Sequence, residues 1–348
     1  MKITEVLSPS ATSPPRTNKF QLHIYPIKSL RGIPLPTASL NAQGIAYDRR
    51  YILLKPAKNG GWINMFVGVS PEMALFHCDA SSPGISFTVS YHTPSPPVAP
   101  PTLAQNSTLE IPFEPNCAEL EKLNIEIYTA PAYPAYRMQD SINTWFSDCF
   151  GYEVILAYLG DSLGVKKSDD TARKWISSIK PSIPRSLLKE VSFSDGAALL
   201  VASEASLQEL HPRLGNGEKA ALEKFRPNIV VDGLVAWDED FWAELILPRT
   251  GARILLTANC ARCSSINVDL QKGKMGNGES GKLLKKMMRD RRVDAGSKWS
   301  PVFGRYGFPV AETDIRIGDE VVVNRRNREH TVWSGFCHLS ANFSANFC

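Results

Sequence analysis

The sequence predicts an α+β protein rich in β-strand, in which a small antiparallel β-unit is followed by a mixed second half. Short segments of alternating apolar and polar residues, separated by turn residues, fill the first part of the chain. Only one early segment has a clear helical period, and the second half lacks the regular strand–helix alternation of a doubly wound sheet. At 348 residues the chain is long enough for two domains.

Four segments of the first half have the pattern expected of strands. They cover residues 20–25, 44–54, 85–90 and 123–128. Between them, the stretch from His92 to Pro101 carries five prolines in ten residues. Because proline has no backbone N–H to donate, this stretch is predicted to be an exposed loop.

The middle of the chain contains the predicted helix, over residues 141–150. Ile142, Trp145, Phe146 and Cys149 stand at helical spacing, and Gly151 is expected to end the helix. Residues 166–189 are polar, basic and interrupted by proline, which indicates a surface connection. Further strands are expected at 153–158, 197–201, 229–231, 244–247, 253–257, 305–310 and 315–323. After the strand at 197–201, Ser203 is expected to cap a helix that runs to about Leu214.

Bulk composition excludes several classes of function. A net charge of +4 is too small to indicate nucleic-acid binding, and there is neither a Gly-x-Gly-x-x-Gly fingerprint nor a phosphate-binding P-loop. Seven cysteines, an odd number, fit reduced thiols inside a cell. Residues 1–18 lack the apolar core of a secretory signal, and no run approaches the roughly 20 apolar residues that span a bilayer. The lack of both favours a cytoplasmic protein. We also expect residues 1–18 to form a flexible N-terminus and residues 326–348 to form an irregular tail.

The most informative local feature is the pair Cys260-Ala-Arg-Cys263, which lies between two strand-like stretches. Thiolates suit a soft metal or an electron-transfer centre. The chain has no second pair at zinc-finger spacing, which disfavours a closed four-sulfur site. The spacing alone leaves open two further interpretations, a pair of inert buried cysteines and a redox dithiol.

Six short motifs, one of which contains this pair, follow one another along the chain. They are Tyr25-Pro-Ile-Lys-Ser-Leu-Arg-Gly32, Asp48-Arg49, Ser203-Glu-Ala-Ser-Leu207, Phe225-Arg-Pro-Asn-Ile-Val230, Cys260-Ala-Arg-Cys263 with Asp269 and Gly273 after it, and Phe303-Gly-Arg-Tyr306. In this order they resemble the MOSC proteins (molybdenum-cofactor sulfurase C-terminal domain) of the two-domain, amidoxime-reducing type. The resemblance runs from about Gln21 to Val323. It implies a MOSC N-terminal β-barrel domain over 19–135 and a mixed β-barrel MOSC domain with peripheral helices over 136–325.

The resemblance also implies a site for the molybdenum cofactor, a pterin dithiolene that carries a phosphate. Cys263 matches the family's molybdenum ligand, whereas Cys260 matches a cysteine that does not bind the metal. The residues that match cofactor-binding positions are Lys28, Ser29, Arg49, Arg226, Asn228, Arg262 and Tyr306. Guanidinium groups suit an anionic phosphate. Taken singly, each arginine could be a surface charge, Asn228 could cap a strand, and Tyr306 could be a half-buried aromatic residue.

Asp195 matches an acidic residue close to the metal, where it could relay protons. Since Ser-Asp-Gly is also favourable turn chemistry, an ordinary turn residue is the alternative. Gly196 and Ala197 depart from the hydroxyl side chains that relatives often carry here. They leave only backbone N–H groups to contact a cofactor.

The activity implied is molybdenum-dependent reduction of N-hydroxylated or N-oxygenated compounds, with release of the oxygen as water. The implied electron donors are cytochrome b5 and its flavin reductase. The stretch from Lys272 to Lys298 contains nine Lys or Arg residues and only three acidic ones. This excess of positive charge could form a docking surface for an acidic electron carrier, or it could be the solvated side of an amphipathic helix. The alternative function is a non-catalytic cofactor or sulfur carrier, although no pyridoxal-enzyme half is present to make a persulfide.

Overall fold

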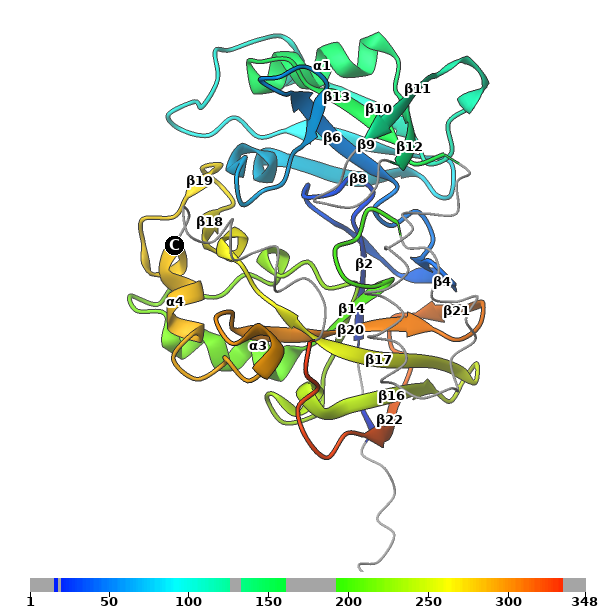
Figure 1. The fold of residues 1–348 in the computed structure, drawn as a ribbon, viewed down its shortest axis with the longest axis vertical. Helices are drawn as coiled ribbons and strands as arrows, with labels where there is room; N and C mark the ends of the chain where they lie inside the picture. Colours follow the sequence, from blue (N-terminus) through cyan, green and yellow to red (C-terminus); the bar gives the residue numbers. More distant parts are fainter. Residues whose placement is uncertain (1–15, 18–19, 126–132, 161–191, 334–348) are drawn as a thin grey trace, which may run out of the picture.

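The computed structural model describes residues 16–17, 20–125, 133–160 and 192–333. The predicted α+β, β-rich class is confirmed, since strands dominate and helices are few and short. Figure 1 shows two parts, one above the other, with the helix α1 (Asp140–Phe150) in the upper part and the largest sheet in the lower. The predicted surface connection at 166–189, together with Cys337 and Cys348, lies outside the described residues.

The largest sheet has nine strands in the order β1-β22-β16-β17-β20-β14-β15-β2-β3. Their bounds are β1 Arg16–Thr17, β2 Phe20–Ile24, β3 Ile33–Leu35, β14 Leu199–Ser203, β15 Ile229–Val231, β16 Trp242–Leu247, β17 Ala252–Ala261, β20 Val302–Pro309 and β22 Val321–Arg326. All neighbours run antiparallel except β14 and β15, which pair in parallel. Strands from the start of the chain therefore complete a sheet that the second half otherwise builds.

The upper part contains a five-stranded sheet, β11-β12-β13-β6-β7, and a three-stranded sheet, β10-β9-β8. Their bounds are β6 Tyr51–Pro56, β7 Trp62–Asn64, β8 Phe76–Ser82, β9 Ser86–Tyr91, β10 Thr108–Pro112, β11 Glu121–Ile125, β12 Tyr133–Arg137 and β13 Ile155–Tyr158. Strand β13 pairs with β6, so residues 155–158 join the first unit in space.

Short elements connect the two parts. A small sheet pairs β4 (Thr37–Asn41) with β5 (Gly44–Ile45) and with β21 (Thr313–Arg316), and β18 (Val268–Asp269) pairs with β19 (Lys274–Met275). Within the described residues, the other α-helices are α3 (Glu204–Leu210) and α4 (Leu283–Met287). The 3₁₀ helices of the same residues are η1 Pro71–Leu75, η2 Ala104–Asn106, η3 Cys117–Glu119, η5 His211–Arg213, η6 Leu222–Lys224, η7 Asp238–Phe241, η8 Ser264–Asn267, η9 Glu279–Lys282 and η10 Ala295–Ser297.

Two predicted strands are wrong because each contains a turn. The stretch 44–54 divides into β5 and β6, since Tyr47 and Arg49 adopt positive φ angles of 68° and 52° that an extended strand excludes. The stretch 315–323 likewise divides into β21 and β22 at Gly318, whose φ is 86°. The first of these turns matters for function because it positions Arg49.

The helix predictions are confirmed in part. Helix α1 ends, as expected, at Gly151, which takes the left-handed conformation with φ 78°. Helix α3 stops at Leu210, short of the expected Leu214, because Pro212 cannot continue the hydrogen-bond ladder and a 3₁₀ turn follows. Ser203 occupies the N-cap position, but its side chain makes no capping hydrogen bond.

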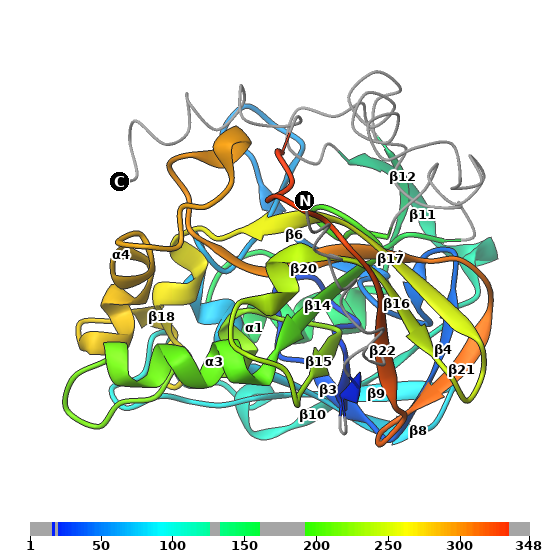
Figure 2. The same ribbon diagram turned by 90° about the horizontal axis from the view of Figure 1, so that it is seen from below.

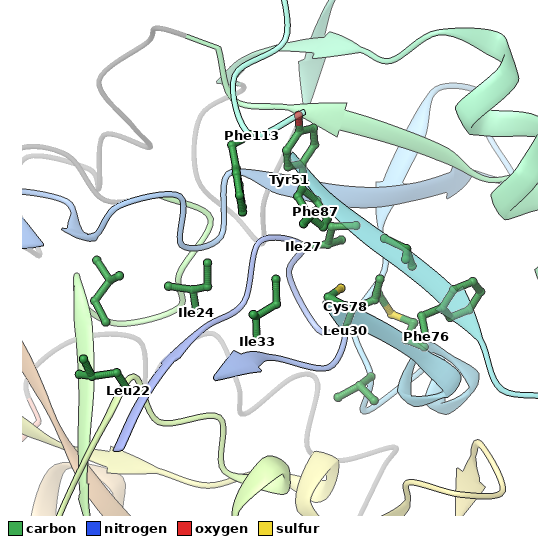
Figure 3. Packing of buried hydrophobic residues seen from close by; sticks show 14 of the residues in the cluster. Leu22, Ile24, Ile27, Leu30, Ile33, Tyr51, Phe76, Cys78, Phe87 and Phe113 are labelled. Carbon is green, nitrogen blue, oxygen red and sulfur yellow. The ribbon is translucent and has the colours of Figure 1, made fainter. Parts of the chain in front are cut away.

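One large apolar cluster joins the two parts of the molecule. It includes Leu22 and Ile24 on β2, Tyr51 on β6 and Phe76 on β8, all essentially inaccessible to solvent (Figure 3). Burying a side chain of this size contributes about 1.5–3 kcal/mol. The apolar strand β2 therefore holds the N-terminal unit against the large sheet, and the turns around Lys28 and Arg49 begin from this junction.

The carboxyl group of Glu239, on η7, is fully buried against α3. Ser206 Oγ donates to Glu239 Oε2 at 2.7 Å, whereas Oε1 has no hydrogen-bond partner within the described residues. Burial raises the pKa of Glu239 from an ordinary 4.5 to about 7, and the Ser206 hydrogen bond only partly opposes this. Between these two values the folded protein keeps a proton that the unfolded chain releases.

The free energy of unfolding should therefore decrease as pH rises through this window, and Glu239→Gln should remove most of that dependence. At pH 8 we expect the variant to exceed the wild type in stability by up to about 3 kcal/mol, with little difference near pH 4.5. Urea unfolding of both proteins from pH 4.5 to 8 measures this. Parallel pH profiles for the two proteins would show that Glu239 does not titrate in this way.

Candidate functional site

The two cysteines of the Cys260–Cys263 pair differ sharply in their surroundings. Cys260 lies near the end of β17 and is 2% exposed, and its Sγ accepts a hydrogen bond from Arg262 Nη1 at 2.9 Å. Cys263 lies just before η8 and is exposed, and its Sγ is 3.2 Å from Ser265 Oγ. Both thiols are free. Cys260 is thus held in the protein interior, whereas Cys263 is accessible to a ligand.

Arg49 is the residue that connects the two halves of the site. Its Nη1 pairs with the carboxylate of Asp48 and donates to Asn228 Oδ1 at 3.2 Å, while Nη2 donates to the Arg226 carbonyl at 3.1 Å. The guanidinium lies 4.8 Å from the centre of the Tyr25 ring. Burial alone favours the neutral form, but Asp48 holds the pKa of Arg49 above its ordinary value.

Asn228 lies behind Arg49, fully buried. Its Nδ2 donates to the His23 carbonyl at 3.2 Å, and its Oδ1 accepts from the Leu200 backbone N–H at 3.1 Å as well as from Arg49. The amide therefore joins strands β2 and β14 and orients the guanidinium. In the structure Asn228 positions Arg49 rather than presenting its own amide at the surface of the site.

Three of the predicted cofactor-binding residues have unusual backbone conformations. Ser29, Arg49 and Arg226 adopt φ angles of 72°, 52° and 52°, and they are half of the six non-glycine residues with positive φ in the described ranges. Arg226 Nη2 donates to the Ser29 carbonyl at 2.6 Å. Such conformations persist only where the surrounding structure fixes them, and they cluster at functional sites.

Lys28 links this group to the turn that carries Asp195. The Lys28 side chain is 6% exposed, and its Nζ donates to the Phe193 carbonyl at 2.8 Å and pairs with the carboxylate of Asp195, which is 61% exposed. The Phe193 backbone N–H donates to the Arg49 carbonyl at 3.0 Å. The turn before β14 is therefore attached to both Lys28 and Arg49, with Asp195 at its solvent side.

The packing of the same turn explains why position 196 is glycine and lacks the hydroxyl side chain that relatives often carry there. A Cβ atom on Gly196 would lie 2.4 Å from Cζ of Tyr306, so the tyrosine ring occupies the space that a side chain would need. Burial, then the neighbouring Cys260 and Asp195, raise the pKa of Tyr306 well above its ordinary value. Arg262 lies on the same side and donates to the Phe225 carbonyl at 3.0 Å. Tyr306 and Gly196 thus pack as one unit between Asp195 and Cys260.

The charges of the site are strongly positive and incompletely compensated. Burial, together with the nearby guanidinium groups of Arg49, Arg262 and Arg31, lowers the pKa of Arg226 to about 10 against the opposing influence of Tyr25. Arg262 Nε and Arg31 Nη1 are buried without a hydrogen-bond partner among the described residues. Because unpaired buried donors and adjacent like charges are unfavourable, this arrangement favours an anionic ligand.

Comparison with known families gives a direct match to both parts. A MOSC N-terminal beta barrel domain matches residues 19–153, and a MOSC domain matches residues 189–322. The chain is a two-domain MOSC protein. Arg49 belongs to the first domain, whereas Arg226, Asn228 and Cys263 belong to the second, so the site lies where the two domains meet.

Curated relatives of this MOSC protein carry two kinds of name. Mitochondrial amidoxime reducing component 2 of Rattus norvegicus is 32% identical over 183 residues, which cover 52% of this chain and 51% of the relative. The protein of the same name from Macaca fascicularis is 27% identical over 86% of this chain and 82% of its own length. Molybdenum cofactor sulfurase of Oryza sativa is 25% identical over 72% of this chain, which is 28% of that relative. The chain thus spans only about half the length of the first relative.

Direct hydrogen bonds join the predicted residues Ser29, Arg49, Arg226 and Asn228, and Phe193 links Lys28 to Arg49. Cys260, Arg262 and Tyr306 form the neighbouring group. Sequence reasoning missed the supporting roles of Tyr25, whose hydroxyl donates to the Pro227 carbonyl at 3.1 Å, and of Arg31. Both residues lie in the motif that supplied Lys28 and Ser29. Their position next to predicted cofactor-binding residues was the available signal, but only the tertiary contacts reveal their roles.

The basic segment after Lys272 presents fewer free charges than its sequence indicates. Helix α4 buries Leu283 and Met287, while Lys282 and Lys286 pair with Glu279. Arg291 is buried and donates twice to the Asp240 carboxylate, at 2.8 and 2.7 Å. Lys272 pairs with Asp269, so the exposed cations that remain are Lys274, Lys285, Arg289, Arg292 and Lys298.

The described part of this MOSC protein holds no helix long and apolar enough to cross a membrane.

The contact between Gly196 and Tyr306 can be tested by mutation. Gly196→Ala should cost about 1–3 kcal/mol of stability, the range for overpacking, because the new methyl group displaces the Tyr306 ring. In a Tyr306→Ala background the same substitution should cost much less, which urea unfolding of the four proteins measures. Gly215→Ala is the matched control, since its Cβ would meet only ordinary contacts of 3.4 Å or more. An equal cost of Gly196→Ala in both backgrounds would contradict the packing described.

Proposed function

We propose that this MOSC protein binds the molybdenum cofactor and reduces N-hydroxylated or N-oxygenated compounds with electrons from an external donor. The observation that carries the proposal is the exposed thiol of Cys263 close to the buried Arg262, which in turn lies near Arg226 in a group of arginines whose charges lack full compensation. A thiolate suits a soft metal, and the arginines suit a phosphate-bearing pterin. The relatives named amidoxime reducing component agree with this assignment.

The residues present fit such a cofactor. Arg262 Nε and Arg31 Nη1 are unpaired donors within the described residues. Gly196 and Ala197 are buried, and the Tyr306 ring packs against Gly196, so at this turn only backbone groups are left to contact a cofactor. In the proposal, Cys263 binds the metal, Lys28, Ser29, Arg49, Arg226 and Arg262 hold the anionic pterin, and Asn228 and Tyr306 support them. When bound, the cofactor would supply the two-electron chemistry that removes oxygen from nitrogen.

Asp195 is the proposed proton carrier of this site. Loss of one oxygen as water consumes two electrons and two protons, and the electrons come from the external donor. Asp195 is largely exposed and pairs with Lys28, so its carboxylate can take protons from solvent and pass them inward. Lys28 holds the carboxylate near enough to Arg49 for its charge to help raise the pKa of that guanidinium.

The electron donor is proposed to be an acidic protein such as cytochrome b5, reduced by a flavin enzyme. Exposed Lys285, Arg289 and Arg292 provide complementary charge on and beside α4. A cytoplasmic location is part of the proposal, supported by the five free cysteines among the described residues. Association with mitochondria is the alternative, since the relatives are named mitochondrial.

The second candidate function is a non-catalytic cofactor or sulfur carrier. It is favoured by the relative named molybdenum cofactor sulfurase and by the accessibility of Cys263, whose thiol could hold a persulfide. A carrier would release its load to an acceptor protein and would not turn over an N-hydroxylated compound. Activity measurements therefore separate the two functions.

The cysteine pair provides the decisive variants. Cys263→Ser should lower the rate of benzamidoxime reduction with an artificial electron donor by more than about 100-fold, because a lost ligand costs more than a lost outer-shell contact. Cys260→Ser is the matched control, and we expect its rate to stay within about tenfold of the wild type, since Cys260 is 2% exposed and its Sγ accepts a hydrogen bond from Arg262. If Cys263→Ser kept wild-type activity, or if only Cys260→Ser lost it, the assignment of the ligand would be wrong.

A further inference from the structure

The segment that follows β22 does not leave the protein surface. Residues 327–333 run from β22 past β16 and β17 toward β20, as the red trace shows in both views (Figures 1 and 2). The backbone N–H of Asn327 donates to the Phe241 carbonyl at 2.7 Å, and the His330 ring lies 4.5 Å from the Phe241 ring. Arg305 Nη1 donates to Thr331 Oγ1 at 3.2 Å. The tail predicted to be irregular over 326–348 is therefore anchored to the protein over residues 327–333, and residues 334–348 lie outside the described ranges.

Trp333, at the end of this anchored segment, is fixed by its backbone. Its N–H donates to Asp294 Oδ1 at 2.9 Å, and that buried carboxylate also accepts from Gly296 N–H at 2.9 Å. A Cβ atom on Gly296 would lie 1.8 Å from the Trp333 carbonyl oxygen, so the close approach of the two chains requires glycine. The position of Trp333 is thus set by the loop at η10.

The indole ring of Trp333 lies against the candidate site. Its centre is 5.8 Å from that of Tyr306, with the two planes at 44°, and it packs on the apolar cluster of Ala197, Ala198, Ala258 and Phe308. Tyr306 fills the space beside Gly196, and Ala197 belongs to the turn that carries Asp195. Trp333 is only half-buried, so part of the indole remains accessible.

We infer that Trp333, together with Tyr306, forms an aromatic wall of the substrate site and gives the protein a preference for N-hydroxylated compounds that carry a planar aromatic ring. This inference rests on the proposed function. Two aromatic residues held at a fixed angle offer a third ring offset-stacked or edge-to-face contacts, which an aliphatic substrate cannot make. Stacking on a ring remote from the reacting nitrogen is equal in the ground state and in the transition state, so its loss raises KM and leaves kcat nearly unchanged.

The test compares benzamidoxime with acetamidoxime, which share the reacting group and differ in the ring. We expect Trp333→Ala to lower the ratio of their kcat/KM values by about two- to tenfold, chiefly through a higher KM for benzamidoxime. Trp333→Phe should keep most of the preference. Val332→Ala, at an exposed neighbour in the same segment, is the matched control and should leave the ratio unchanged. Equilibrium dialysis of both compounds against the cofactor-loaded proteins measures their binding without turnover.

The outcomes separate this inference from the proposed function. If the wild type reduces both compounds and Trp333→Ala lowers both kcat/KM values equally, or neither, the aromatic wall is refuted while the function stands. If the wild type reduces neither compound but binds benzamidoxime more weakly after Trp333→Ala, the function is refuted while the wall stands. If Trp333→Ala keeps both the binding of benzamidoxime and the selectivity of the wild type, the aromatic wall is refuted whatever the activity.

Discussion

The site depends on the buried ion pair of Asp48 and Arg49 at the junction of the two domains. Removing a charge from water is costly unless it is paired and hydrogen-bonded, and here the guanidinium has Asp48, Asn228 and the Arg226 carbonyl as partners. These partners come from both domains. Arg49 can therefore be accommodated only when the domains are assembled, so the construction of the site and the joining of the domains are one event.

This arrangement concentrates unfavourable features in one place. Positive φ angles at Ser29, Arg49 and Arg226, crowded guanidinium groups and unpaired donors each reduce the stability of the folded chain. The apolar cluster that joins β2 to the N-terminal sheets offsets these costs. An anionic ligand would relieve the repulsion among the arginines and supply acceptors for the unpaired donors, which is the behaviour of a preorganised binding site.

Much of this architecture follows from local patterns in the sequence. The alternation in β2 and β9, the helical period of α1 and its ending at Gly151 are local properties, and the structure agrees with them. The turn at 46–50 could not be predicted, because Arg49 and its neighbours read as part of an apolar strand and their left-handed conformation is fixed by tertiary partners. The pairing of β2 with β15 joins residues about 200 positions apart, which no local period reveals. Trp333 lies in a segment without periodicity, and only its contacts with Asp294 and Tyr306 give it a role.

The most direct test of this account is the molybdenum and pterin content of the purified full-length protein from a host that makes the cofactor. The account predicts close to one molybdenum and one pterin per chain, because an accessible thiol and a shell of arginines are present to hold them. Zinc in place of molybdenum, or protein that folds stably with neither molybdenum nor pterin from such a host, would contradict the central claim that the domain junction is a molybdenum-cofactor site.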